Sequence, residues 1–152
     1  MPVTIRLAGT EDIETLFDIR TSVVQNHQSR AELAEIGVTP SSVAALLEAS
    51  SQAWIAEVAK EPAGFVLADA ARACVFGMFV RPRFEGQGVG RRLMAQAEAF
   101  LFDHHDLIWL TTGAGDDIRA NGFYRRLGWT PVGLTERGDE MRYEKSRTGS
   151  PL

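Results

Sequence analysis

A glycine-rich turn near the middle of the chain constrains the fold more than any other stretch of the sequence. It follows an apolar run that ends at Val80 and precedes a helical run that begins at Arg91. Its sequence is Glu85-Gly86-Gln87-Gly88-Val89-Gly90. Because glycine has no side chain, the alternate glycines leave backbone N–H groups bare where a strand passes into a helix N-terminus, and these groups can converge on an anion. The spacing differs from the dinucleotide fingerprint and from a Walker loop. The turn therefore predicts a cradle for another phosphate-bearing ligand.

Apolar patterning on both sides of the turn predicts a mixed sheet flanked by helices, an α/β (α+β) fold. Thr10 is expected to cap a helix over about residues 11–26, and Pro40 stands at the first position of a later helix. Short apolar runs separated by turn residues predict an antiparallel meander. The predicted strands are 3–7, 53–58, 63–68, 73–80, 107–112, 129–134 and 140–144, and helices are expected at 40–49, 91–102 and 118–127, with a helical turn at 31–36.

Length and composition indicate one cytoplasmic domain. The chain has 152 residues, 45% of them hydrophobic, which suffices for a single core without disulfides or metal. We expect the domain over residues 1–145 and a disordered tail over 146–152. Cys74 is the single cysteine, so a disulfide framework is excluded and a reducing compartment fits. The sequence shows no secretory or membrane-spanning run, so no membrane partner is expected.

The charge of the chain argues against nucleic acid as a partner. Its net charge is -4, whereas nucleic-acid binding depends on neutralising many phosphates. Positive charge is nevertheless concentrated beside the glycine turn, in Arg81, Arg83, Arg91 and Arg92. This cluster suits a ligand with a few phosphates, and the alternative is a solvated arginine-rich surface.

Two motifs together resemble the GCN5-related N-acetyltransferase (GNAT) superfamily, over nearly the whole chain. The first runs from Val75 to Leu101, where the family pattern is Arg or Gln, two residues, Gly, one residue, then Gly or Ala. Gly88 and Gly90 fill the glycine positions, but Glu85 stands at the Arg/Gln position. The second motif, residues 117–129, is similar to the family's C-terminal helix and the strand after it. The resemblance implies a GNAT-like fold with a mixed, mostly antiparallel sheet of about seven strands and about four helices.

The resemblance also implies acetyl-coenzyme A as co-substrate, with its pyrophosphate on the glycine turn. Backbone amides and the positive end of a helix dipole would hold that anion. The pantetheine arm would lie beside the strand that ends at Val80 and pair with it like an added strand. We expect the carboxylate of Glu85 to turn outward, because it would repel a pyrophosphate. The expected binding residues are Met78, Phe79, Val80, Glu85, Gly86, Gln87, Gly88, Val89, Gly90, Arg91 and Asp117.

Tyr124 occupies the position at which the family places a phenol near the sulfur of the co-substrate. Acyl transfer needs a neutral amine and a proton for the departing thiolate, and Tyr124 is the expected general acid. The alternative is that Tyr124 only packs between helix and sheet. No motif specifies the general base. His27, in the break after the first helix, is a candidate for the base or for the acceptor pocket, and the alternative is an exposed polar residue.

These observations predict an acyl-coenzyme A-dependent N-acyltransferase, most simply an acetyltransferase acting on a primary amine of a small molecule or peptide. Direct attack is expected, because Cys74 lies inside a predicted central strand and does not suit a covalent route. His104 and His105 read as a solvated turn, and no metal is expected. The alternative function is a non-catalytic acyl-coenzyme A binding or sensing module. A homodimer through the last strands is implied by the family only.

Overall fold

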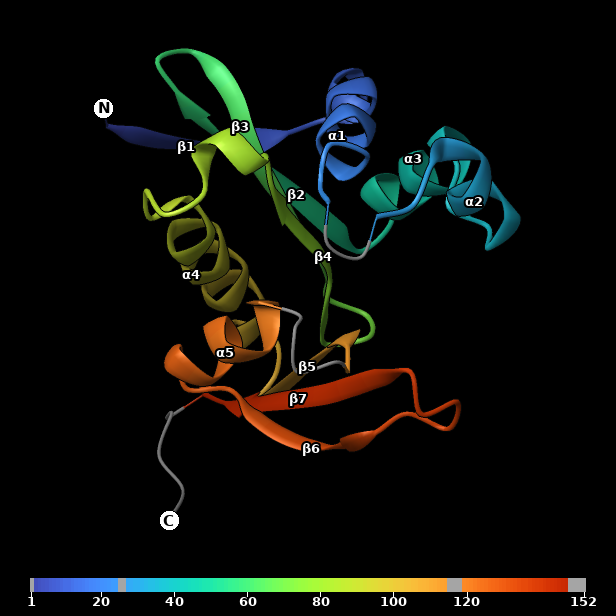
Figure 1. Cartoon of the computed structure of the whole chain (residues 1–152), viewed down its shortest axis with the longest axis vertical. Coiled ribbons are helices and arrows are strands. Elements are labelled where there is room, and N and C mark those ends of the chain that lie inside the picture. The colour runs from blue at the N-terminus through green and yellow to red at the C-terminus, as the bar shows by residue number, and fades with distance from the viewer. Residues whose placement is uncertain (1, 25–26, 115–118, 148–152) are drawn as a thin grey trace.

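Seven strands form one mixed sheet. The computed structural model describes residues 2–24, 27–114 and 119–147. The strands are β1 (Val3–Ala8), β2 (Ser51–Val58), β3 (Glu61–Asp69), β4 (Cys74–Val80), β5 (Leu107–Gly113), β6 (Thr130–Leu134) and β7 (Glu140–Ser146). Their order is β1-β2-β3-β4-β5-β7-β6, and all neighbours are antiparallel except β4 and β5 (Figure 1). The predicted mixed, mostly antiparallel sheet is confirmed.

Helices cover both faces of this sheet. They are α1 (Ile13–Arg20), α2 (Arg30–Glu35), α3 (Pro40–Glu48), α4 (Val89–Phe102) and α5 (Arg119–Arg126), with 3-10 turns at Thr10–Asp12 and Pro82–Phe84. Residues 30–35 form a helix of their own because Ser29 caps them: its hydroxyl accepts from Glu32 N–H at 3.1 Å. The described residues therefore hold five α-helices, one more than the sequence predicts.

Alternation along the strands divides the interior into two cores. In β2, Ile55 packs into the core beneath α1 and α3, whereas Trp54 packs into the core beneath α4 and α5. Figure 1 shows α1, α2 and α3 on one side of the sheet and α4 and α5 on the other. None of the described helices combines the length and apolar character that a membrane crossing needs.

Two predicted boundaries are wrong. The first helix ends at Arg20 and not near residue 26, because hydroxyl groups take the last carbonyls: Thr21 Oγ1 donates to Phe17 O at 2.8 Å, and Ser22 Oγ to Ile19 O at 2.6 Å. The predicted tail begins too early, since Ser146 pairs with Leu107 in the sheet. Residues 148–152 lie outside the described part.

The parallel neighbours β4 and β5 separate soon after they meet. Their register contains Cys74 opposite Trp109, and the N–H of Trp109 donates to Ala73 O at 3.0 Å. Beyond this point the described residues show no further pairing between the two strands, and their carboxyl ends diverge (Figure 1). An edge of β4 is therefore left open in the middle of the sheet.

Candidate active site

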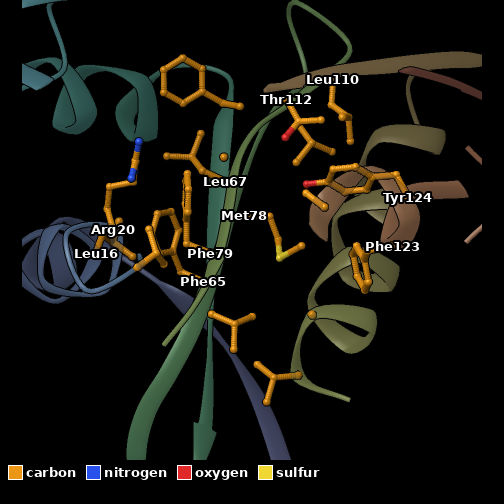
Figure 2. A pocket seen from close by; sticks show the side chains of 18 of the residues that line it. Leu16, Arg20, Phe65, Leu67, Met78, Phe79, Leu110, Thr112, Phe123 and Tyr124 are labelled. Atoms are coloured by element: carbon orange, nitrogen blue, oxygen red, sulfur yellow. The ribbon is translucent and has the colours of Figure 1, made fainter. Parts of the chain in front are cut away.

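A cavity of about 1020 Å³ occupies the gap between β4 and β5 and opens on both faces of the sheet. In Figure 2, Arg20, Phe65 and Phe79 lie on the α1 side of β4, whereas Met78 and Tyr124 lie on the α4 and α5 side. The glycine turn lines one end of the same cavity. A single cleft therefore joins the predicted phosphate cradle to the predicted catalytic phenol.

The glycine turn has the geometry of an anion cradle. Gly86 has φ +77° and Gly88 has φ +83°, a left-handed conformation that favours glycine. A Cβ atom added at either residue would meet nothing within 4 Å, so the space in front of the backbone is open. Gly88 is the N-cap of α4, and no side chain of the described residues caps this helix end. The first-turn N–H groups and the helix dipole are thus available to a phosphate.

Gly90 serves a different purpose from the two glycines before it. A Cβ atom there would lie 3.2 Å from Cζ of Phe123 and 3.7 Å from Cε of Met78. The missing side chain lets the start of α4 pack closely against α5. This contact brings the cradle and the helix that carries Tyr124 to the same cleft.

Only part of the predicted arginine cluster is available to a ligand. Nε of Arg81 donates to Pro62 O at 3.0 Å, Arg83 pairs with Glu61, and Arg92 donates to Val3 O. Arg91 is exposed and lines the cavity, and its side chain forms no ion pair or hydrogen bond within the described residues. It is the cation of this cluster that a pyrophosphate on the turn would meet first.

Four other predicted binding residues differ in their placement. Glu85 is exposed and lines the cavity beside the turn, so the outward orientation of its carboxylate stays a prediction. Gln87 is exposed, does not line the cavity, and donates from Nε2 to Arg83 O at 3.3 Å. Asp117 lies outside the described residues. Val89 is buried at the start of α4 and also lines the cavity.

The strand β4 turns alternate backbone groups toward the cleft. The N–H of Arg81 donates to Ala63 O at 2.8 Å, and because bonded and non-bonded pairs alternate, Phe79 pairs with β3 through its backbone. Met78 and Val80 therefore direct their backbone groups away from β3 and toward the gap. The side chain of Phe79 instead packs on the α1 side of the sheet. Of the three predicted residues of β4, Met78 and Val80 therefore present backbone groups to the cleft, and Phe79 presents its ring.

A bulge at Phe76 sets this alternation. Leu67 is opposite Gly77 whereas Ala68 is opposite Val75, so Phe76 has no partner in β3. The bulge changes which residues of β4 face the cleft, and it leaves the ring of Phe76 44% exposed on the cavity lining.

Tyr124 points its hydroxyl into the cleft, near Thr112 (Figure 2). Its ring is 6% exposed and is held by edge or tilted contacts with Phe123, Trp129 and Tyr143, at centroid distances of 5.4, 6.3 and 5.7 Å. Burial raises the pKa of the phenol well above its usual range, and the neighbouring Tyr143 adds to the rise. The hydroxyl therefore stays protonated near neutral pH and is positioned as a donor.

The structure does not bring His27 to the cavity. Its ring is exposed, and Nδ1 lies 2.9 Å from Val23 O. Neighbouring residues Val24 and Gln28 do line the cavity. His105 contacts Ala70 O, and no three His, Cys, Asp or Glu side chains of the described residues are grouped to hold a metal ion.

Arg20 and Glu140 also line the cavity, and sequence reasoning missed Arg20 but named Glu140 within the segment 138–143 expected on the acceptor side. Arg20 is 9% exposed at the end of α1, and Glu140 is exposed at the start of β7. Arg20 carried one usable signal: a charged residue among the apolar positions of an amphipathic helix. Of the segment 138–143, Glu140 is the residue that lines the cavity.

One cleft therefore contains a cradle at a helix N-terminus, an open strand edge and a protonated phenol. The model of the acetyltransferase (GNAT) family matches residues 11–129, and the chain belongs to this family of enzymes. No curated protein matches the chain in sequence.

Solved structures share the fold at low sequence identity. PaiA N-acetyltransferase from Thermoplasma acidophilum, in complex with coenzyme A, has a TM-score of 0.80 at 16% identity, over 96% of this chain and 99% of its own. A probable acetyltransferase from Staphylococcus epidermidis has a TM-score of 0.77 at 13% identity, over 96% and 99%. The ribosomal-protein-S18-alanine N-acetyltransferase from Escherichia coli has a TM-score of 0.68 at 17% identity, over 94% and 91%.

Proposed function

We propose that this protein transfers the acetyl group of acetyl-coenzyme A to a primary amine, by direct attack and with Tyr124 as the proton donor. The observation that carries the proposal is the Tyr124 hydroxyl, which faces the cleft between the glycine turn and the open edge of β4. The acceptor is a small molecule or peptide, since the cleft opens to solvent at exposed residues such as Val24 and Glu140.

The chain has a matching element for each part of the co-substrate. Backbone amides at Gly86, Gly88 and the first turn of α4 suit the pyrophosphate, and Arg91 adds a cation there. Backbone groups of Met78 and Val80 suit the amides of the pantetheine arm, as an added strand would. Acetyl-coenzyme A supplies the thioester, and the N–H of Val80 can donate to its carbonyl oxygen as negative charge develops there.

The proton inventory of the reaction explains why a protonated phenol is useful. The amine forms a bond to the acetyl carbon and loses one proton, while the carbon–sulfur bond breaks and the thiolate gains one. A thiol has a pKa of about 8.5 in water, and burial raises it, so a buried thiolate takes a proton more readily. Tyr124 remains protonated until the sulfur becomes negative, and it then donates.

Glu140 is the carboxylate that we assign to the acceptor end. It lines the cavity from β7 and pairs in the sheet with Gly113 at the end of β5. Glu85 is the other carboxylate among the described lining residues, and it belongs to the phosphate end. Glu140 can attract an ammonium group and accept its proton, directly or through water.

The test is Tyr124→Phe, which removes the hydroxyl and keeps the ring among its aromatic neighbours. Turnover should fall by about 10² to 10⁴, the usual contribution of a general acid, and coenzyme A affinity should not change. Turnover is measured by thiol release and affinity by calorimetry. Unchanged turnover would show that Tyr124 only packs.

Tyr143→Phe is the matched control. Tyr143 lies in the same aromatic cluster, but its hydroxyl donates to Oδ1 of Asn121 at 2.8 Å and does not line the cavity. Removing it should lower stability by about 1 kcal/mol and leave turnover unchanged. The alternative function, a non-catalytic binding module, predicts coenzyme A binding without thiol release for any amine in a broad panel.

A further inference from the structure

The half of the cleft that faces α1 contains a buried cation. Resting on the proposed function, we propose that the amine acceptor carries an oxyanion that the guanidinium of Arg20 binds, together with an apolar group. The acceptor would then be a zwitterion of the amino-acid type.

Arg20 is held as a fixed part of the cavity wall. It is the last residue of α1, is 9% exposed, and lines the cavity. Nη2 donates to Oε1 of Gln28 at 2.8 Å, and Cζ lies 4.2 Å from the centroid of the Phe79 ring. Figure 2 shows the side chain beside Leu16 with its nitrogens directed along the α1 side of β4. A guanidinium orientated in this way presents the planar fork that matches an oxyanion.

Phe79 connects Arg20 to the part of β4 beside which we place the thioester. Its ring stacks on the guanidinium, and its neighbours Met78 and Val80 direct their backbone groups into the gap where the thioester would lie. Arg20 is therefore one side chain away from the strand at which transfer takes place. An oxyanion bound there would belong to the same small molecule as the attacking amine.

Among the charged residues that line the cleft, Arg20 and Glu140 together are complementary to a zwitterion. Arg20 lies on the α1 side, and Glu140 lines the cavity from β7. Burial lowers the pKa of the Arg20 guanidinium from its ordinary value, yet an arginine stays charged at neutral pH. An oxyanion beside it regains the interaction that water no longer provides. A diamine would instead bring a second cation toward Arg20.

The wall around Arg20 is apolar. Large hydrophobic side chains from α1, α2, α3 and the sheet line this half of the cavity: Leu16, Phe17, Leu33, Val43, Phe65 and Leu67. At the mouth, Val24 and Ile36 are 80% and 64% exposed, and both line the same cavity. An acceptor with an apolar side chain would cover this exposed surface, whereas a fully polar acceptor would leave it wet.

The test compares acceptors that share a body and differ in charge. With acetyl-coenzyme A, we expect kcat/KM for phenylalanine to exceed that for phenylalaninamide and for phenethylamine by about 10- to 100-fold, the range for a hydrogen bond to a charged group. Aminoethyl phosphate against ethanolamine forms the second arm, which distinguishes a phosphate from a carboxylate. A wild-type preference for the amide, for phenethylamine or for a diamine would overturn the proposal.

Variants separate a binding role of Arg20 from a structural one. Arg20→Gln should reduce the ratio of kcat/KM for the acid over the amide to about one, and Arg20→Lys should restore part of that ratio. Should Arg20→Gln fail to fold, Gln28→Glu offers the same test, because a carboxylate at that position neutralises Arg20 without removing it. If the ratio of kcat/KM for the acid over the amide is unchanged when Arg20 is neutralised, the inference is contradicted.

A binding measurement separates this inference from the proposed function. In the presence of coenzyme A, phenylalanine should raise the thermal midpoint more than its amide, and Gln28→Glu should abolish the difference. If no amine causes thiol release, the proposed transferase activity is refuted. The shifts of the thermal midpoint would still show whether Arg20 binds an oxyanion. Transfer to amines regardless of their charge would refute the anion site alone.

Discussion

Replacing Gly88 by alanine is the most direct test of the phosphate cradle. Gly88 has φ +83° and ψ +6°, and a Cβ atom added there meets no protein atom within 4 Å. The new methyl group would therefore not clash with the protein. It would occupy the open space in front of the backbone, where we place the pyrophosphate. The variant should keep the fold and lose affinity for coenzyme A.

The expected magnitudes follow from two separate costs. A non-glycine residue in the left-handed conformation costs about 1–2 kcal/mol, which sets the expected loss of folding stability. Keeping a phosphate oxygen off one backbone N–H costs a hydrogen bond to a charged group, about 1.5–3 kcal/mol. Since about 1.4 kcal/mol corresponds to a factor of ten, coenzyme A should bind about 10- to 150-fold more weakly.

Gly138→Ala is the matched control for the backbone cost. Gly138 has φ +74° and equally open surroundings, but it lies in the turn between β6 and β7 and does not line the cavity. Denaturant unfolding should give similar losses of stability for both variants, and calorimetry should give a weaker coenzyme A affinity for Gly88→Ala alone. Equal coenzyme A affinity in the two variants would refute the placement of the pyrophosphate on this turn.

Two further predictions concern Glu85 and Cys74. Glu85→Gln should strengthen coenzyme A binding by at most about fivefold, because exposed charges 4 Å apart interact with about 1 kcal/mol in water. High salt should remove this gain in affinity. Weaker binding in the variant would show that the carboxylate assists the ligand. Burial raises the pKa of the Cys74 thiol to about 11, and the side chain is 3% exposed, so a disulfide reagent should label it only after denaturation. Rapid labelling of the native protein at pH 8 would contradict this placement.

The sequence predicted those parts of the site that depend on local backbone chemistry. Gly86 and Gly88 predict a turn with positive φ, and such a turn directly before an amphipathic helix is typical of an anion-binding site. Tyr124 was found through the motif around it, and its burial follows from the apolar residues at helical spacing in α5. These features need only a few consecutive residues to be specified.

Features that depend on pairing between distant segments could not be predicted from the sequence. The bulge at Phe76 arises because Leu67 and Ala68 take partners that are two residues apart in β4, and no spacing within β4 alone reveals it. Because the sequence does not reveal the bulge, Phe79 and Met78 were equally reasonable as residues that bind the co-substrate through their backbone groups. The structure instead gives Phe79 a side-chain role on the α1 side of the sheet.

Arg20 shows the same limit for charge. In the sequence it reads as a basic residue in the last turn of a helix, where a cation interacts favourably with the dipole and usually faces solvent. The helix ends at that residue because Thr21 and Ser22 bind its last carbonyls, and Gln28 then returns to accept from the guanidinium. Had the helix continued to residue 26 as predicted, Gln28 would lie further along the helix axis and could not hold Arg20 against Phe79. An early helix end therefore places the cation in the wall of the cavity, where we propose that the acceptor binds. Restoring helix-favouring residues, as in Thr21→Ala with Ser22→Ala, should weaken the selectivity for the acid over the amide without changing coenzyme A affinity.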